Sequence, residues 1–376
     1  MDHAETKPPP RSPVVAVTCG DPAGIGPEVA CLAWSATETH ARARLRIVAD
    51  PALIADVLAR RRGMPRLNVE VIAAGDPRPS NRETLLVVSP DFAAGPGPKE
   101  PVPLEPAMIE SGVISAAGGA AAARAVEAAF AATRHGVIDA IVTGPLHKEA
   151  LRAAGFDVPG HTELLARACG LPDEAASMML WLPAAHEAVG AGAGLGVVHA
   201  TLHESLRSAV ARLSSSGIEA AGMRLTSLLA ALLGRPPRIA VAALNPHGGE
   251  GGLFGDEESR IVAPAVARLA AAGVAVTGPL PADTLFLRAS RGEFDGVVAL
   301  YHDQGHIPIK LLGMHRAVNI TLGLPLVRTS VAHGTGFDIV GQGVADPSSM
   351  LSAIEAAVRL VAAGWPSIAT ASVPAR

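Results

Sequence analysis

The chain has 376 residues, of which 49% are hydrophobic and 18% are charged, and its formal net charge is −4. This apolar content excludes a disordered chain, and the length suits two domains or one large α/β unit. An acidic balance and 3% aromatic residues argue against a nucleic-acid partner. Long apolar runs are broken before the ~20 residues of a membrane span, and the first residues contain no apolar signal core. We therefore expect a soluble cytoplasmic protein without a membrane partner.

The predicted elements alternate between strand and helix along the chain. An apolar, β-branched run at residues 14–19 ends in a Gly- and Pro-rich turn. Further strand-like runs lie at residues 45–49, 69–73, 84–89, 138–143, 195–199, 238–244, 274–277, 295–300, 317–322 and 327–331. Helical patterns lie at residues 121–133, 205–233 with an interruption at 214–217, 256–272 and 347–363. This alternation predicts an α/β fold with mainly parallel strands. Residues 93–106 are expected to form an exposed loop, and the first dozen residues to be disordered.

Polar segments that directly follow strands are the first candidates for a ligand site, because open α/β sheets bind ligands beyond the carboxyl ends of their strands. Five segments meet this condition, at residues 20–28, 143–148, 245–252, 301–310 and 319–328. The three cysteines (Cys19, Cys31 and Cys169) are too few and too scattered for a disulfide framework or a CxxC site.

Some residue types are rare enough for their positions to be informative. Only four of the 31 basic residues are lysines, at Lys7, Lys99, Lys148 and Lys310. Asparagine also occurs only four times, and Tyr301 is the single tyrosine. A base-composition bias against lysine, with a few lysines retained by chance, explains Lys7 and Lys99. It does not explain why Tyr301, Lys310 and Asn319 fall within one short segment.

Three histidines follow or end strand-like runs: His203, His247 and His302. Neutral imidazoles that converge from separate strand ends would form an open site for a divalent metal. The spacing itself is no metal signature, and the chain contains 13 histidines. Capping or surface roles therefore remain the alternative for each, and His306, His315 and His333 compete for the same role.

A second group of side chains suits an anion. Lys310, Asn319 and Arg328 follow one another at intervals of nine residues in apolar surroundings. An ammonium, a carboxamide and a guanidinium brought together would hold a phosphate or carboxylate. His161 and Thr162 could hydrogen-bond a polar ligand, or Thr162 could cap a helix. The Gly-rich loops at residues 20–26 and 245–252 match neither the GxGxxG fingerprint nor a Walker motif. Backbone N–H groups of a third Gly-rich loop, at residues 333–343, could meet a phosphate or adenine, or the loop could be a structural turn.

Taken together, the motifs resemble those of the 4-hydroxythreonine-4-phosphate dehydrogenase family. They are TCGDPAGIGPEV, TGPLHKEAL, GHTELL, LNPHGGEGG, GPLPADTLF, YHDQGHIPIK and NITLGLPLVRTS, and they occur in the family's order. The resemblance implies a two-lobed fold of the isocitrate/isopropylmalate dehydrogenase type, with α/β/α layers and a central cleft. It further implies that residues 12–138 and 315–376 build a dinucleotide-binding lobe, and residues 139–314 a lobe for metal, substrate and dimerisation.

The same resemblance implies roles for individual residues. The metal ligands would be His203, His247 and His302. The substrate contacts would be His161, Thr162, Lys310, Asn319 and Arg328, with Asp283 and Asp303 nearby as catalytic candidates alongside Lys310. The loop HGTGFDIVGQGVADP resembles a dinucleotide-contacting loop of the wider group, and implies contacts from Gly334, Thr335, Gly336 and Asp346.

The implied reaction is the NAD- or NADP-dependent oxidation of a phosphorylated β-hydroxy acid, followed by loss of carbon dioxide. A divalent ion (Zn, Mg or Co) on the substrate hydroxyl would lower its pKa and stabilise the enolate left by decarboxylation. The proton acceptor stays open among Lys310, Asp283, a metal-bound water and Tyr301. A homodimer with its active site near the subunit interface is implied as well.

The chain also departs from the family pattern. Leu202–Leu206 and Val331–His333 differ from the usual family segments, and residues 184–196 resemble an insertion. HIPIKLLG is more similar to a sister branch that acts on 4-phospho-D-threonate or 4-phospho-D-erythronate, giving dihydroxyacetone phosphate. A third branch resembles cis-dihydrodiol dicarboxylate dehydrogenases. The alternatives outside catalysis are an anion-binding two-lobed protein and a catalytically silent paralogue.

Overall fold

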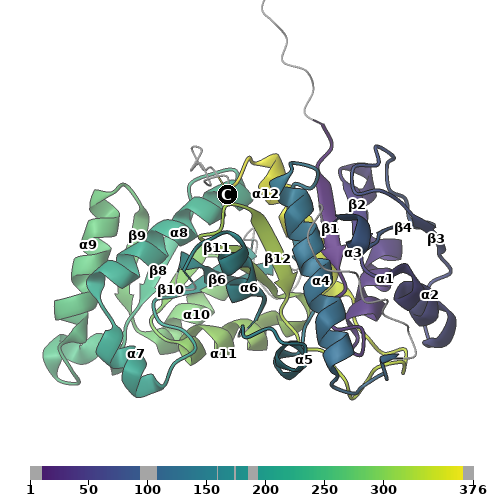
Figure 1. Ribbon diagram of the computed structural model, residues 1–376. Coiled ribbons are helices and arrows are strands. Elements are labelled where there is room, and N and C mark those ends of the chain that lie inside the picture. Colours follow the sequence, from purple (N-terminus) through teal and green to yellow (C-terminus); the bar gives the residue numbers. More distant parts are fainter. Residues whose placement is uncertain (1–10, 94–107, 159, 173–174, 185–193, 367–376) are drawn as a thin grey trace, which may run out of the picture.

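The fold is known from a computed structural model, which describes residues 11–93, 108–158, 160–172, 175–184 and 194–366. Three expectations fall largely outside these ranges: the disordered first dozen residues, the exposed loop at 93–106 and the insertion-like segment at 184–196. The ribbon in Figure 1 shows helices packed against one long sheet, with β9 at one end and β3 at the other.

The described residues form a twelve-stranded sheet with the order β3-β4-β2-β1-β5-β12-β11-β6-β7-β10-β8-β9. The strands are β1 (Val14–Thr18), β2 (Arg44–Val48), β3 (Asn68–Val71), β4 (Thr84–Val88), β5 (Ala140–Thr143), β6 (Ser177–Pro183), β7 (Gly194–His199), β8 (Arg238–Ala242), β9 (Ala275–Leu280), β10 (Gly296–Ala299), β11 (Val318–Leu322) and β12 (Val327–Val331). Eleven of them coincide with the predicted strand-like runs. The exception is β6, whose sequence SMMLWLP lacks the β-branched residues that marked the others.

The sheet contains two parallel blocks that run in opposite directions. The strands from β3 to β12 pair in parallel, and so do β7, β10, β8 and β9. Between these blocks, β11 pairs antiparallel with both β12 and β6, and β6 pairs antiparallel with β7. The α/β fold with mainly parallel pairing is thus confirmed. The sheet is continuous, so the proposed division into lobes at residues 138/139 and 314/315 stays a prediction.

Helices cover both faces of the sheet and give three layers. They are α1 (Gly26–Ala36), α2 (Pro51–Arg60), α3 (Pro90–Ala93), α4 (Ala116–Arg134), α5 (Lys148–Ala153), α6 (His161–Ala168), α7 (Leu206–Arg212), α8 (Ser215–Leu233), α9 (Ala263–Ala271), α10 (Ala282–Ser290), α11 (His302–Gly313) and α12 (Ser348–Ala362). Shorter helical turns are η1 (Thr39–Ala41), η4 (Pro246–Gly252), η5 (Glu258–Val262) and η6 (Met314–Arg316). One face carries α1, α12 and α8, which contact one another in that order; α4 packs on β1 and β5, and α11 on β10 and β7.

The predicted helices are present, with adjusted boundaries. The break expected at residues 214–217 falls at Leu213 and Ser214, because Ser214 is the N-cap of α8 and its Oγ accepts a hydrogen bond from the Gly217 N–H at 3.2 Å. The predicted helix at 256–272 begins with the π-helical turn η5 before it continues as α9.

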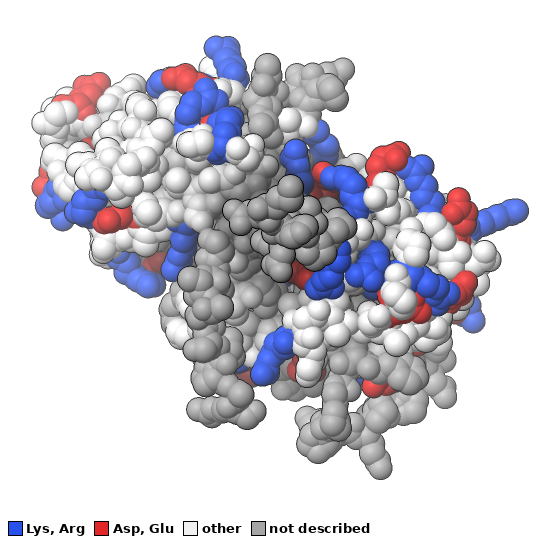
Figure 2. All heavy atoms as spheres, turned by 90° about the horizontal axis from the view of Figure 1, so that it is seen from above, with Lys and Arg blue, Asp and Glu red and all other residues white. Residues whose placement is uncertain are grey.

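Surface charge, cysteines and helix length are three further features of the described residues. On the face shown in Figure 2, Lys and Arg are interspersed with Asp and Glu, and their described atoms form no continuous basic surface. All three cysteines are free, and two of them are buried. Within the described ranges, no helix has the length and apolar character needed to cross a bilayer.

A buried carboxylate joins the chain segments that precede β8 and β10. Asp295 is 1% exposed, and its two oxygens accept hydrogen bonds from Arg235 at 2.8 and 2.9 Å and from the backbone N–H of Arg238 at 2.8 Å. Burial by itself raises the pKa of this carboxyl, but the hydrogen bonds from Arg235 and Arg238 outweigh it and hold the pKa well below its ordinary value. Asp295 therefore stabilises this end of the sheet as a carboxylate.

We expect Asp295→Asn to lower the free energy of unfolding by about 2–3 kcal/mol, because it weakens charge-assisted bonds to a buried group. The matched control is Asp256→Asn, whose pair with Arg260 is exposed, and it should change the same quantity by less than ~0.5 kcal/mol. Since the folded-state pKa is depressed, the contribution of Asp295 is complete above pH ~3.9 and is lost as the pH falls below that value. Urea denaturation across pH checks both statements; equal losses in the two variants would contradict them.

Candidate active site

Four histidines gather where β7 and β10 end. His203 follows β7, which ends at His199, and His302 begins α11 directly after β10. The ring centroids of His203 and His302 lie 5.7 Å apart. His306 stacks on His302 at a centroid distance of 3.7 Å, and its Nδ1 lies 3.1 Å from His199 Nε2. The structure thus brings together two of the three predicted metal ligands and adds two buried imidazoles behind them.

A cavity of about 500 Å³ opens beside this cluster. It is lined by Thr201–Leu206, Ala209, Tyr301, His302 and Asp303. Asp303 Oδ1 lies 2.6 Å from His302 Nδ1 and accepts its proton in a hydrogen bond, because a carboxylate has no proton to donate. In the neutral ring this hydrogen bond leaves the lone pair on Nε2, which is the usual arrangement of a ligand histidine. Asp303 was predicted as a catalytic candidate, and in this structure it orients His302.

Backbone strain occurs at the predicted ligands. Among the described residues, the non-glycine positions with left-handed φ are His203 (50°), His247 (54°) and Glu250 (43°). Such a conformation costs an L-residue roughly 1–2 kcal/mol and persists only where its surroundings enforce it. Two of the three strained residues are thus histidines that were singled out from the sequence, which is typical of a functional site.

His247 does not join the other two histidines within one chain. It lies in η4, which follows β8, and β8 is the sheet neighbour of β10. Its nearest aromatic contact is Phe254, at a centroid distance of 6.5 Å. Within the described parts of the chain, no three His, Cys, Asp or Glu side chains are arranged to hold a metal ion. The expected meeting of all three imidazoles is therefore not formed by the single chain.

Arg328 is a buried cation that no described carboxylate contacts directly. The residue is 4% exposed and forms no ion pair with the described residues. Nη1 donates to Thr321 Oγ1 at 3.0 Å and Nη2 to Thr143 Oγ1 at 2.6 Å, while Nε is buried without a partner. Burial lowers the pKa of Arg328 to about 10, against the opposing charge of Glu163. Because an isolated buried charge is costly, this arrangement is typical of a site that receives an anion.

Two further predicted substrate residues lie with Arg328. The register of β11 and β12 places Asn319, Thr321 and Arg328 on one face of the sheet. Asn319 Nδ2 donates to a backbone carbonyl at 3.2 Å, while its Oδ1 is buried without a partner. His161, the first residue of α6, also has an unpaired buried Nε2, and burial together with the charge of Arg328 holds its pKa well below the ordinary range. Thr162 follows it in the same helical turn.

The predicted cofactor residues lie in the loop after β12. Thr335 O accepts a hydrogen bond from the Ile25 N–H at 2.8 Å, so this loop packs on the turn that follows β1. Around Gly334 there is open space, whereas Gly336 packs directly on Ile25. Asp346 Oδ1 accepts hydrogen bonds from the Ser348 N–H and Oγ, at 2.9 and 2.6 Å, beside the start of α12. The structure therefore assigns Asp346 a capping contact, and the cofactor contacts stay predictions.

Comparison with known proteins identifies the family. The family described as "Pyridoxal phosphate biosynthetic protein PdxA" matches residues 42–357. The chain is 42% identical over 350 residues to a D-threonate 4-phosphate dehydrogenase of Cupriavidus necator (93% of this chain, 97% of the relative), and 43% identical over 351 residues to a 4-hydroxythreonine-4-phosphate dehydrogenase of Beijerinckia indica (92% and 94%). A crystal structure of the latter enzyme from Klebsiella pneumoniae superposes with a TM-score of 0.75 at 41% identity (93% and 98%). This chain belongs to the PdxA family.

Two charged residues, Lys148 and Glu163, influence the pKa of His203 in this PdxA-family chain. Neither was among the predicted site residues. Burial, the adjacent His302 and the Lys148 ammonium lower the pKa of His203, while Glu163 raises it. Lys148 follows β5, in the other parallel block, and Figure 1 shows α5 and α11 at the same end of the molecule. The rarity of lysine was the signal that pointed to Lys148; nothing in the sequence distinguished Glu163.

Lys310 and Asp283 lie outside the cavity in this PdxA-family chain. Lys310 is exposed in the last turn of α11, where its charge contributes to lowering the pKa of His306. Asp283 is exposed in the first turn of α10. Of the side chains considered as proton acceptors, Tyr301 alone lines the cavity.

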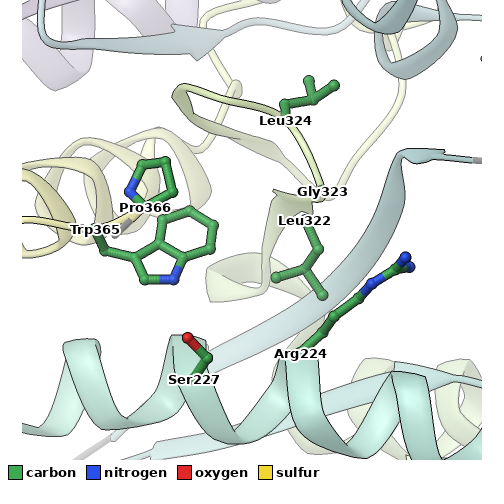
Figure 3. Close-up of a pocket in the computed structure, with 7 residues that line it drawn as sticks. All are labelled: Arg224, Ser227, Leu322, Gly323, Leu324, Trp365 and Pro366. Atoms are coloured by element: carbon green, nitrogen blue, oxygen red, sulfur yellow. The ribbon is translucent and has the colours of Figure 1, made fainter. Parts of the chain in front are cut away.

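A second hollow, of about 220 Å³, lies away from these residues. Figure 3 shows Trp365 and Pro366 on one side of it, and Leu322 and Arg224 on the other. Arg224 Nη1 donates to Ser177 Oγ at 3.2 Å, and the lining contains no histidine or carboxylate. This hollow offers no acid, base or metal ligand and contains none of the predicted site residues.

Gly305 allows α11 to approach the sheet beneath the histidines. A Cβ at this position would lie 2.4 Å from His199 Nε2 and 2.7 Å from Val197 Cγ1. We expect Gly305→Ala to lower the free energy of unfolding by about 1–3 kcal/mol, since the clash outweighs the helix-propensity gain of ~1 kcal/mol. The control, Gly334→Ala, meets no atom within 4 Å. Urea denaturation of both variants checks this; unchanged or increased stability of Gly305→Ala would show that the helix tolerates the methyl group.

Proposed function

We propose that this protein is an NAD- or NADP-dependent, divalent-metal-dependent dehydrogenase that oxidises and decarboxylates a four-carbon phosphorylated β-hydroxy acid. The observation that carries the proposal is the buried Arg328, which has no ion-pair partner among the described residues, beside the unpaired polar atoms of His161 and Asn319. The histidine-lined cavity and the family membership support the choice of reaction.

We propose 4-phospho-hydroxythreonine as the substrate, converted to 3-amino-2-oxopropyl phosphate in pyridoxal phosphate biosynthesis. A second candidate is 4-phospho-D-threonate or 4-phospho-D-erythronate, which would give dihydroxyacetone phosphate. It is favoured by the segment HIPIKLLG and by the relative from Cupriavidus necator. Because identities of 42% and 43% do not separate the two classes, an assay has to decide. A cis-dihydrodiol dicarboxylate is the third candidate.

The residues present fit a divalent metal ion in part. His203 and His302 are neighbours, and a lowered pKa keeps His203 neutral, as metal coordination requires. When bound, the ion would polarise the substrate oxygen and lower the pKa of the hydroxyl group. Asp303 would hold the His302 ring in the correct orientation through its hydrogen bond to Nδ1.

In this proposal the anion-binding residues orient the substrate. Thr143 and Thr321 hold the Arg328 guanidinium in one conformation through their hydroxyl groups. Its unpaired Nε–H would then donate to the phosphate or carboxylate, and little side-chain entropy would be lost on binding. Asn319 Oδ1 and His161 Nε2 then satisfy polar groups of the same ligand. For the cofactor, we propose contacts from Gly334, Thr335 and Gly336, where the open space at Gly334 allows close approach.

We further propose that the protein is a homodimer in which His247 of the partner subunit completes each metal site. This follows from the incomplete ligand set of the single chain. Apolar side chains are exposed on both sides of the required contact: Leu311 on α11 is 81% exposed, and Leu253, next to η4, is 71% exposed. Burial of these side chains in a twofold interface would stabilise the assembly.

The function is tested by NADH formation, with each metal ion supplied, on 4-phospho-hydroxythreonine, 4-phospho-D-threonate and 4-phospho-D-erythronate. Turnover of one of them supports the proposal and selects the substrate, whereas turnover of none would move the choice to a dihydrodiol. If the protein also binds no divalent metal, the anion-binding alternative is favoured.

We expect Arg328→Lys to raise KM for the phosphorylated substrate about 10–100-fold, because lysine lacks the planar fork and loses its proton more readily when buried. Arg60→Lys, at a 79% exposed side chain, should leave KM unchanged. Steady-state kinetics measures both; an unchanged KM in Arg328→Lys would remove Arg328 from the substrate site.

Subunit mixing tests the shared site. His203→Ala and His247→Ala dimers should each be inactive, and a mixture after subunit exchange should recover about a quarter of wild-type activity, since half the dimers then contain one intact site. Mixing His203→Ala with His302→Ala should recover none, because both residues come from the same chain. Recovery in neither mixture would show that His247 is not supplied by the partner subunit.

A further inference from the structure

The loop that carries His247 has an unusual backbone. Residues 247–251 have φ angles of 54°, 71°, 80°, 43° and 70°, and Gly252 follows at 103°. Six consecutive residues thus lie in the left-handed region, although His247 and Glu250 have side chains that disfavour it. Such a path does not persist on local preference alone, so neighbouring groups must hold it.

Glu258 is the group that holds the start of this loop. Its side chain is 6% exposed, and its Oε1 accepts the backbone N–H groups of Leu244 and Asn245 at 2.8 and 2.7 Å. Its Oε2 accepts Asn245 Nδ2 at 2.9 Å. Asn245 lies two residues before His247, so these three bonds fix the chain where the left-handed path begins.

The loop also packs back onto this carboxylate. A Cβ at Gly249 would lie 2.8 Å from Glu258 Oε2, so the backbone passes directly over it. Burial raises the pKa of Glu258, but the hydrogen bonds from Asn245 and Leu244 lower it below its ordinary value. The group is therefore an ionised acceptor. The neighbouring Glu257 accepts a hydrogen bond from the same amide, Asn245 Nδ2, at 2.8 Å. The backbone N–H groups of Leu244 and Asn245 donate to Glu258 instead.

We propose that Glu258 is a positioning residue that aims His247 at the metal site and thereby sets the affinity for the ion. The inference rests on the proposed function, in which His247 is a metal ligand. Glu258 touches neither metal nor substrate. It acts through the backbone, because rotation at Asn245 would release the left-handed path and redirect the imidazole.

The experiment measures the Zn²⁺ affinity of the full-length protein by competition with a chromophoric chelator. Glu258→Gln replaces one acceptor oxygen with a donor that faces Asn245 Nδ2, and we expect it to weaken Zn²⁺ binding about 10–100-fold. Glu257→Gln is the matched control and should change the affinity less than about 3-fold. Asn245→Ala removes the amide contacts with Glu257 and Glu258 but keeps the backbone hydrogen bonds to Glu258. It serves as the second variant if Glu258→Gln folds poorly, and its loss of Zn²⁺ affinity should lie between those of the other two variants.

A double-mutant cycle separates positioning from general stability. In a His247→Ala background, Glu258→Gln should cause no further loss of Zn²⁺ affinity, although its effect on thermal stability should be the same as in the wild-type background. An equal loss of affinity in both backgrounds would overturn the inference, as would unchanged affinity in both Glu258→Gln and Asn245→Ala. If wild-type protein binds neither Zn²⁺ nor Co²⁺ nor Mg²⁺, the metal site of the proposed function fails as well.

Discussion

The buried guanidinium of Arg328 is the constraint on which the site depends. A cation that is 4% exposed, with two threonine hydroxyls but no carboxylate as partners, is costly in the empty protein. An anion bound beside the guanidinium, as proposed, would offset that cost, because Thr143 and Thr321 already hold two of its donor nitrogens. The unpaired atoms of His161 and Asn319 lie with the same cation, so several buried polar groups of this region have no hydrogen-bond partner among the described residues.

The second determinant is the reversal of direction inside the sheet. The insertion of β6 and β11 between the two parallel blocks means that the loops after β5 and the loops after β7 leave from strands of opposite direction. The charge of Lys148 nevertheless acts on His203. Charged residues that follow strands of one block therefore lie close enough to the imidazoles of the other block to influence their pKa.

Strain and its compensation form a third theme. Left-handed backbone at His203 and His247 would relax in isolation, and in the folded chain it is balanced by contacts with little freedom. For His247 these are the hydrogen bonds that Glu258 accepts from Leu244 and Asn245. The close approach of Gly305 to His199 is a separate constraint, which sets how near α11 lies to the sheet. The positions of these histidines thus depend on neighbouring residues as well as on their own backbone.

Much of this protein was determined by the sequence alone. Apolar runs located eleven strands, because β-branched clusters bounded by Gly and Pro have few other structures open to them. Residue chemistry pointed to Arg328 and Asn319, which the structure places on one face of the sheet, and to His203 and His302, which it places side by side; their roles stay predictions. Local pattern did not show β6, the reversed block, the influence of Lys148 and Glu163 on the pKa of His203, or the separation of His247 from His203 and His302 within one chain. These features arise from strand pairing and contacts between residues far apart in the chain. A local pattern encodes which face of an element is buried, but it does not encode which distant element covers that face, and only the tertiary structure decides that.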